Sequence, residues 1–376
     1  MDETLKRFRT LVESPYEKLA AWKEKSSRKV VACSPMHFPE ELIHASGMLP
    51  VVLQETNEVI TNGFSYIYPF YCGITRNMID IASKGQLDFL DGIFYTDICI
   101  QARTGGAILR RILKKQPVFH TSPPMVMNRI NAHEATANTY QRIKAQVEQM
   151  SGTSINDKSL SNSIAVYNRN RTLLHTLREL RKRSPRLISY GDLMTVVQAS
   201  MLMPKEDHNE LLEKLITSVK KAKAPEDKRK KVFLSGHLCQ KPKLDIVDIV
   251  EEAGGTVIDD DLYTGFRYYA VDAGANGDPM QALVNLYIDK SLPVPTRTYP
   301  PLRWDNYLTQ RVQESGAKGV VVLMVKYCEP HLFNYPFIKE SMANAGIPHI
   351  MLETEHEVVS LEGIKTRLQA FMEMLK

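Results

Sequence analysis

The sequence predicts an α/β fold made of two similar parallel-sheet lobes joined by a helical segment. Short apolar runs alternate with amphipathic stretches in residues 29–128 and again in residues 231–376, as in parallel sheets with helical crossovers. The second region begins as the first does, because Lys231-Val-Phe-Leu-Ser-Gly236 resembles Lys29-Val-Val-Ala-Cys-Ser34. We therefore expect two Rossmann- or flavodoxin-like lobes, with a site in the cleft between them.

The first 28 residues are expected to form helix ahead of the first lobe. Apolar side chains recur at roughly helical spacing through residues 3–26. Pro15 follows Ser14, and proline suits the first turn of a helix. The pattern therefore predicts two helices that meet at Pro15.

Residues 29–128 contain the first set of alternating elements. Apolar runs predict strands, and the stretches between them have helical periodicity. Pro39 opens the first of these helices, and Gly47 ends it. The expected strands are 29–33, 49–53, 89–95 and 117–120, and the expected helices are 39–47, 75–84 and 103–114.

Residues 129–230 differ, because β-branched runs are scarce there. The expected helices are 131–150, 159–183, 190–203 and 205–223. The charge run 220–231 ends the segment. It is compatible with a phosphate-binding patch, but a solvated linker is the more usual role of such a run.

The second lobe, residues 231–376, is expected to repeat the first. Strands are expected at its start, at 256–258 and from Gly319 onward, and the segment from Gly316 mirrors the one from Gly85. Cys99 and Cys328 then follow equivalent strands of the two lobes, which favours a shared role for them.

Composition places the chain among ordinary globular proteins. It has 376 residues, of which 43% are hydrophobic and 24% charged, with a formal net charge of +5. That charge is too mild to indicate nucleic-acid binding. No secretory signal or membrane span is expected. Five irregularly spaced cysteines argue against a disulfide scaffold, so a reducing cytoplasm is the expected location.

The cysteines carry the strongest functional signal. Cys72, Cys99 and Cys328 each stand where an apolar run gives way to a loop, and Cys239 is a fourth candidate. Ligand sites of open α/β sheets lie beyond the carboxyl ends of the strands, so these thiols are placed to converge. Thiolates suit zinc or an iron–sulfur cluster, and an apolar setting favours the cluster. The alternative is that each cysteine is a buried small hydrophobic residue.

Other residues have a functional and a structural interpretation. His37 and His237 follow the first strand of each lobe, where a histidine can donate a proton to a reduced substrate or serve as a hydrogen-bonded structural residue. Asp259 to Asp261 follow an apolar strand, and pairing with Arg267 is the commoner outcome than metal binding. Gly105-Gly106 and Gly254-Gly255 match no nucleotide-binding signature, so turn or helix-cap roles are expected.

Three segments are similar to the 2-hydroxyacyl-CoA dehydratase / benzoyl-CoA reductase family of iron–sulfur D-component proteins. They are Pro39-Glu-Glu-Leu-Ile-His-Ala-Ser-Gly-Met-Leu-Pro50, Lys326-Tyr-Cys-Glu-Pro330 and Gly346-Ile-Pro-His-Ile-Met-Leu-Glu-Thr-Glu355. The resemblance runs from about residue 29 to the C-terminus and is weakest in the helical middle. Cys239 together with the segments 259–267 and 277–283 is most similar to the smaller, gamma-type subunits of the benzoyl-CoA reductase branch.

The resemblance implies a 4Fe–4S cluster bound by Cys72, Cys99 and Cys328. If Cys239 is the fourth ligand, the cluster is closed and relays electrons; if it is not, an open iron can meet substrate. The implied partners are a larger paralogous subunit, ATP-hydrolysing iron–sulfur activator subunits, ferredoxin as electron source and an aromatic acyl-CoA.

The implied function is that of a subunit of an ATP-dependent reductase, which reduces the ring of benzoyl-CoA with single low-potential electrons. The alternatives are the small (beta) subunit of an (R)-2-hydroxyacyl-CoA dehydratase, which eliminates water through a ketyl radical, a catalytically silent scaffold subunit, and, more distantly, a zinc-binding interaction module.

Overall fold

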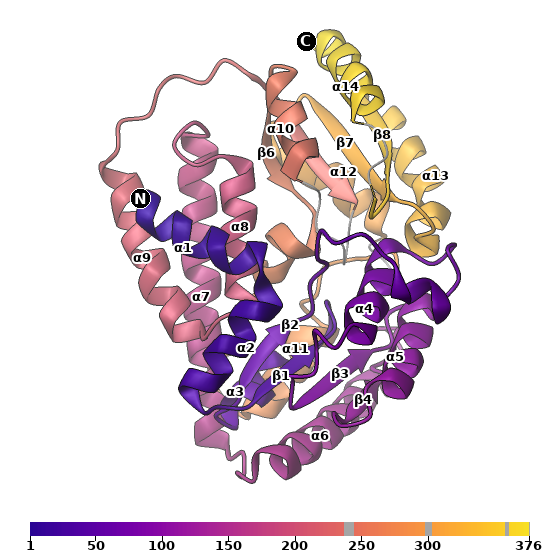
Figure 1. Ribbon diagram of the computed structural model, residues 1–376. Coiled ribbons are helices and arrows are strands. Elements are labelled where there is room, and N and C mark those ends of the chain that lie inside the picture. The colour runs from indigo at the N-terminus through magenta and orange to yellow at the C-terminus, as the bar shows by residue number, and fades with distance from the viewer. Residues whose placement is uncertain (237–243, 298–302, 358–360, 376) are drawn as a thin grey trace.

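A computed structural model describes residues 1–236, 244–297, 303–357 and 361–375 (Figure 1). Within them the chain forms two four-stranded sheets in which all neighbouring strands are parallel. The first sheet contains β1 (Val30–Cys33), β2 (Leu49–Val52), β3 (Gly92–Thr96) and β4 (Val118–Thr121). The second contains β5 (Lys230–Gly236), β6 (Gly255–Asp260), β7 (Gly319–Val325) and β8 (His349–Thr354).

The two sheets share one topology. Their strand orders are β2-β1-β3-β4 and β6-β5-β7-β8, so each strand of one sheet has a counterpart in the other. The central strands β1 and β7 are buried along their whole length, which explains their continuous apolar runs. The predicted α/β fold with two similar lobes is confirmed.

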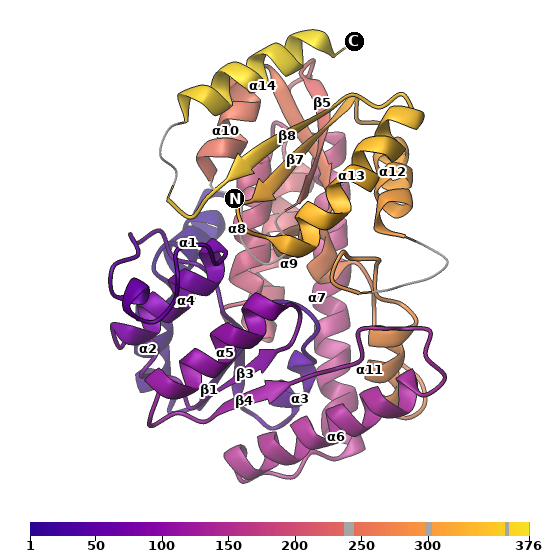
Figure 2. The same ribbon diagram turned by 90° about the vertical axis from the view of Figure 1, so that its right-hand side faces the viewer.

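Helices flank both sheets (Figures 1 and 2). The chain begins with two helices that meet at Ser14 and Pro15, as the sequence predicts: α1 (Asp2–Glu13) and α2 (Pro15–Ser26). The first lobe then adds α3 (Glu40–Ala45), the short 3-10 helix η1 (Asn62–Ser65), α4 (Gly73–Ser83) and α5 (Ile100–Ile112).

The middle of the chain is helical, in agreement with its pattern. Its helices are α6 (Ala132–Ser151), α7 (Asp157–Arg183), α8 (Tyr190–Ser200) and α9 (Lys205–Lys221). α7 packs on α9, and α1 packs on both α8 and α9. Residues 222–229 form neither helix nor strand, and Arg229 pairs there with Asp227 and Glu251. The linker interpretation of the charge run therefore fits the structure.

The remaining helices belong to the second half of the chain. They are α10 (Leu244–Glu252), the π-helical turn η2 (Tyr263–Arg267), α11 (Pro279–Ile288), α12 (Trp304–Ser315), α13 (Glu329–Asn344) and α14 (Glu362–Met374). α11 lies against α6 and α7, far from its neighbours in sequence (Figure 2). Among the described helices, none has the length and apolar character that a bilayer-spanning helix needs.

Two local expectations are wrong. Asp259 and Asp260 belong to β6, which runs further than expected. Asp259 is tolerated in the strand because Arg178 and Arg311 pair with it. Gly105 and Gly106 lie inside α5 and not in a turn or cap, because a Cβ on either would press on Tyr95. By contrast Asp261 pairs with Arg267 at 2.9 Å, as expected.

Direct contacts join the two lobes beside their strand ends. His356, which follows β8, pairs with the buried Glu55, and its Nε2 lies 2.7 Å from the carbonyl oxygen of Glu58. Arg76 on α4 pairs with Glu355. These contacts hold the carboxyl ends of the two sheets against each other and so create the cavity described next.

Candidate functional site

Three of the predicted thiols line one cavity between the lobes. Cys72 and Cys99 come from the first lobe, and Cys328 comes from the second. The structure thus brings together residues 256 positions apart in sequence (328 − 72). We call this space the thiol cavity. Cys239 and His237 lie outside the described residues.

Each of the three cysteines is the N-cap residue of a helix. Cys72 precedes α4, Cys99 precedes α5 and Cys328 precedes α13. Cys99 and Cys328 follow the equivalent strands β3 and β7, as predicted. The helix N-termini direct positive dipole ends and backbone N–H groups toward the cavity, which favours thiolates and other anions there.

The position of Cys72 corrects one expectation. The apolar run 64–72 is not a strand, because its first residues complete η1 and the rest form turns. Its aromatic side chains are largely exposed, with Tyr68 at 68% and Phe70 at 57%. The apolar pattern of this run therefore marks a surface, and the thiol reaches the cavity through the start of α4.

Hydrogen bonds orient each sulfur atom. Cys72 Sγ is 3.3 Å from Thr75 Oγ1, and Cys99 Sγ accepts from the backbone N–H of Ala102 at 3.3 Å. Cys328 Sγ is 3.0 Å from Nδ1 of the buried His331. In all three cases the partner is three residues after the cysteine, the spacing of an N-cap contact. Sequence reasoning missed Thr75 and His331, although this spacing could have indicated them.

Gln101 ties the three thiol-bearing segments together. It follows Cys99 by two residues, and its Oε1 accepts from the backbone N–H of Cys72 at 2.6 Å. Its Nε2 donates to the carbonyl of Tyr327, the residue before Cys328, at 2.7 Å. Tyr327 has a positive φ of 65°, a strained conformation for a non-glycine residue. Sequence reasoning missed Gln101, because only the fold shows that one side chain reaches both other segments.

The thiol cavity is apolar and shielded. Its walls include Ile74, Met78, Ile98 and Val325. Burial raises the pKa of Cys72 to about 11, and burial likewise raises the pKa of Cys99 and Cys328. Without a cation the three groups are therefore protonated thiols near neutral pH, and binding of metal must displace their protons.

The donor set fits a cluster better than a single ion. Within the described ranges no group of three or more His, Cys, Asp or Glu side chains is arranged to hold one metal ion. A mononuclear zinc site needs its ligands around one centre, whereas an iron–sulfur cluster distributes its thiolates over several irons. Three thiols from separate helices on an apolar wall match the second requirement.

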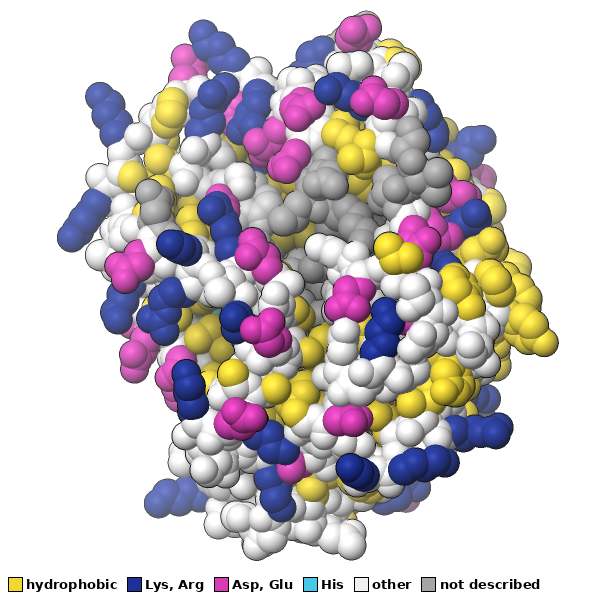
Figure 3. Space-filling view, viewed as in Figure 1, with side chains coloured by type: hydrophobic (Ala, Val, Ile, Leu, Met, Phe, Trp, Pro, Cys, Tyr) yellow, Lys and Arg dark blue, Asp and Glu magenta, His cyan; other side chains and the backbone are white. Residues whose placement is uncertain are grey.

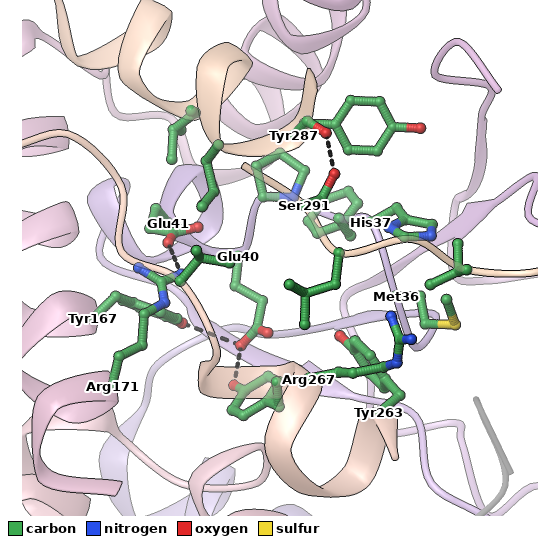
Figure 4. Close-up of a pocket in the computed structure, with 18 of the residues that line it drawn as sticks. Met36, His37, Glu40, Glu41, Tyr167, Arg171, Tyr263, Arg267, Tyr287 and Ser291 are labelled. Atoms are coloured by element: carbon green, nitrogen blue, oxygen red, sulfur yellow. Dashed lines mark hydrogen bonds and ion pairs between the residues drawn. The ribbon is translucent and has the colours of Figure 1, made fainter. Parts of the chain in front are cut away.

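The predicted proton donor His37 lies in a neighbouring cavity (Figure 4). Ser34 and Pro35 of the loop after β1 line the thiol cavity, while Met36 and His37 line the neighbour. Burial, followed by the charges of Arg297 and Arg267, lowers the pKa of His37 well below its usual value. The ring is therefore neutral at neutral pH, and its role in proton transfer stays a prediction.

Comparisons with known proteins agree with the geometry. The family model described as 2-hydroxyglutaryl-CoA dehydratase, D-component, matches residues 35–375. The (R)-phenyllactyl-CoA dehydratase beta subunit of Clostridium sporogenes is 26% identical over 374 residues, which cover 100% of this chain and 99% of that protein. A benzoyl-CoA reductase subunit of Thauera aromatica is 27% identical, with 94% and 93% covered. The (R)-2-hydroxyglutaryl-CoA dehydratase beta subunit of Acidaminococcus fermentans is 28% identical, with 99% and 98% covered.

Proposed function

We propose a function on the premise that this chain belongs to the 2-hydroxyglutaryl-CoA dehydratase D-component family, whose model it matches over residues 35–375. The chain is an enzyme subunit of the benzoyl-CoA reductase or 2-hydroxyacyl-CoA dehydratase type. It holds a 4Fe–4S cluster on Cys72, Cys99 and Cys328, with Cys239 as a further candidate ligand, and works in an oxygen-poor cytoplasm.

The observation that carries this proposal is the convergence of three helix-capping thiols on one apolar cavity. A cluster supplies the ability to take up and release one electron at a time. The chain's own residues hold the thiolates in place, through Thr75, His331 and Gln101, and exclude water through the apolar walls.

The leading activity is reduction of an aromatic acyl-CoA. The benzoyl-CoA reductase relative matches nearly the full chain, and the segment 259–267, which resembles the reductase branch, borders the neighbouring cavity through Tyr263 and Arg267. The proton donors are proposed to be His37 and His237.

Dehydration of a 2-hydroxyacyl-CoA is the second candidate. Relatives named as dehydratase beta subunits match the chain at nearly the same identity, 26% and 28%, and over nearly its full length. Both reactions require an electron delivered to an acyl thioester, so one electron-transferring subunit suits either.

Exposed apolar side chains beside the thiols support a partner at this face. Phe70, Ile100 and Phe333 lie within five residues of Cys72, Cys99 and Cys328, and all three are more than half exposed. Figure 3 shows hydrophobic side chains gathered at the right-hand edge of that view, over the segment that leads into α4. Such patches mark protein interfaces, and we assign this one to a larger paralogous subunit. ATP-hydrolysing iron–sulfur activator subunits and ferredoxin complete the proposed complex.

The cluster is tested by anaerobic purification and analysis of iron and sulfide. The protein should be brown and show a 4Fe–4S spectrum, and Cys99→Ala should lose most of its iron. Cys33→Ala is the matched control, because Cys33 is buried in β1 and does not line the thiol cavity. A colourless protein that takes up only zinc, or a Cys99→Ala variant with full iron and turnover, would overturn the cluster proposal.

The substrate is tested with the reconstituted complex. Benzoyl-CoA and a 2-hydroxyacyl-CoA are supplied separately with reductant and ATP, and products are identified by mass spectrometry. Ring reduction supports the reductase, whereas loss of water from the hydroxyacyl-CoA supports the dehydratase. Turnover that survives removal of all three thiols would instead indicate a scaffold role for this chain.

A further inference from the structure

The cavity next to the thiol cavity has the features of a separate ligand site. It encloses about 150 Å³, well above the roughly 10–15 Å³ that one water molecule requires. Its walls come from the loop after β1, from α3, α6, α7 and α11, and from the segment 291–297. We call it the arginine pocket.

Arg297 is the unusual residue of the arginine pocket. It is 9% exposed, and within the described residues no carboxylate lies within ion-pair distance of it. Its Nη1 donates to Ser291 Oγ at 2.9 Å, but its Nε has no hydrogen-bond partner in the described part of the chain. A buried cation without a counter-ion is costly, so a ligand that supplies negative charge would stabilise it.

The other cations of the pocket already have partners. Arg171 pairs with Glu41 at 2.6 Å, and Arg267 pairs with Asp261. Lys205 donates to the carbonyl oxygen of Ser200 and to the hydroxyl of Tyr268 at 2.8 Å. Among the described charged groups that line the pocket, Arg297 is thus the cation whose charge is unmatched.

His37 provides a second unsatisfied group in the same pocket. Its Nε2 is buried, and no described residue forms a hydrogen bond with it. Its ring packs edge-on against Tyr287, whose ring also lies 4.8 Å from the Arg297 guanidinium. Met36 and His37 both have positive φ angles, 73° and 60°. Such strain costs about 1–3 kcal/mol at each residue and accumulates at binding sites.

The rest of the lining defines the shape of the ligand. Leu283, Leu286, Leu292 and Val294 give an apolar wall. Glu40 and Glu41 lie with Tyr167 and Arg171 on the side of the pocket opposite His37 (Figure 4). These carboxylates repel a second negative group, so the ligand should carry one anionic group and an apolar body.

We propose that the arginine pocket binds a small organic carboxylate, with the carboxylate toward Arg297 and His37 and the apolar body against the leucine wall. The site goes beyond the proposed function and does not depend on a metal at the thiols. The low pKa of His37, caused by burial and then by Arg297 and Arg267, agrees with a positive potential that awaits an anion.

The test uses the full chain, purified anaerobically, with benzoate as the probe in isothermal titration calorimetry at fixed ionic strength. Saturable binding of benzoate is expected, and Arg297→Gln should weaken it at least tenfold. Arg169→Gln is the matched control, because Arg169 pairs with Glu213 on the exposed face of α7 and does not line the pocket. Benzamide, which has the same shape without the charge, should bind at least tenfold more weakly than benzoate.

Thermal unfolding keeps the test informative if a variant is poorly folded. Benzoate should raise the Tm of the wild-type chain and of Arg169→Gln but not that of Arg297→Gln, and His37→Asn should show a reduced shift. Equal affinity of Arg297→Gln and wild type for benzoate overturns the proposal, as does saturable binding of inorganic phosphate in place of benzoate. Iron analysis of each sample separates this result from the cluster, since benzoate binding is expected with or without iron.

Discussion

At the level of single residues, the side chain of Gln101 decides how the thiols are held. It is 8% exposed, and it satisfies one buried donor and one buried acceptor in two different lobes. An unsatisfied buried backbone group costs about 1–3 kcal/mol. Gln101 therefore stabilises the strained turn at Tyr327 and the start of α4 at the same time.

Gln101→Leu should lower the free energy of unfolding by at least about 2 kcal/mol, because both backbone groups lose their partner. It should also lower the iron content, since Cys72 and Cys328 are no longer held in register. Urea unfolding and iron analysis measure the two effects. Gln116→Leu is the control, since Gln116 is equally buried and its side chain donates to the carbonyl of Asp88, away from the thiol cavity. Equal losses of iron in the two variants would contradict the assigned role.

At the level of elements, the start of α4 is fixed by contact with the opposite lobe. A Cβ on Gly73 would lie 2.7 Å from Cβ of His356, closer than two carbon atoms can pack. Gly363 occupies a similar position in the first turn of α14, and a Cβ there would meet no described atom within 4 Å. The same substitution therefore has opposite consequences at two helix starts.

Gly73→Ala should destabilise the protein by about 1–3 kcal/mol, because overpacking outweighs the better helix propensity of alanine. It should also displace Cys72, the preceding residue, and reduce iron retention. Gly363→Ala should stabilise the protein by up to about 1 kcal/mol and leave iron unchanged. Denaturant midpoints and iron analysis of both variants decide the matter, and a neutral or stabilising Gly73→Ala would show that the lobes yield at this contact.

His208 joins three helices of the middle segment and should confer acid sensitivity. On α9, its Nδ1 lies 2.8 Å from Nδ2 of Asn170 on α7, and its Nε2 lies 3.0 Å from the carbonyl oxygen of Val196 on α8. Burial, followed by the charge of Lys205, lowers the pKa of His208 from 6.5 to about 3. The folded state thus keeps the ring neutral where the unfolded chain protonates it.

A histidine whose folded pKa is depressed contributes stability above pH 6.5 that is lost as the pH falls toward 3. In that window His208 should contribute a slope of about 1.4 kcal/mol per pH unit to the unfolding free energy. His208→Gln should show a shallower slope between pH 6.5 and 4 in urea unfolding, and His120→Gln, at an exposed histidine, serves as control. Parallel slopes in wild type and His208→Gln would refute this origin of acid sensitivity.

At the level of the whole molecule, the two lobes meet through their strand ends and leave apolar side chains beside the thiol cavity. The contacts of Glu55, Arg76 and Gln101 with residues 327 and 355–356 fix this arrangement. Phe333, at 75% exposure on the first turns of α13, is the most exposed of the described aromatic residues on this face. A paralogous partner bound there would bring its own site close to the thiols.

Phe333→Glu should weaken binding of the partner at least tenfold, because a charge placed in an apolar interface is left without a counter-ion. Its iron content should match that of wild type, since Phe333 does not line the thiol cavity. Co-purification and sedimentation of the complex measure the effect. Met374→Glu, at an equally exposed position on α14, is the control, and an unchanged complex in Phe333→Glu would place the interface elsewhere.

Most of the architecture could be predicted because it depends on local patterns. The proline at residue 15 splits the first helices, the apolar runs of β1 and β7 reflect burial on both faces, and the repeated start of the second lobe reflects one topology used twice. The prediction was wrong where apolar residues serve a surface, as in 64–72, and where buried carboxylates continue a strand, as Asp259 does beside Arg178. Periodicity alone does not distinguish a core from an interface, nor reveal a distant counter-ion.

The sequence by itself determined the fold class, the family and the identity of three thiols that share a site. It did so because helix and strand periodicity and residue spacing are properties of neighbours along the chain. Only the tertiary structure decided that Gln101 links the thiol segments, and that Arg297 and His37 meet in a second pocket where no described carboxylate balances the arginine. Those relations depend on where separate loops meet in space, which no local pattern encodes.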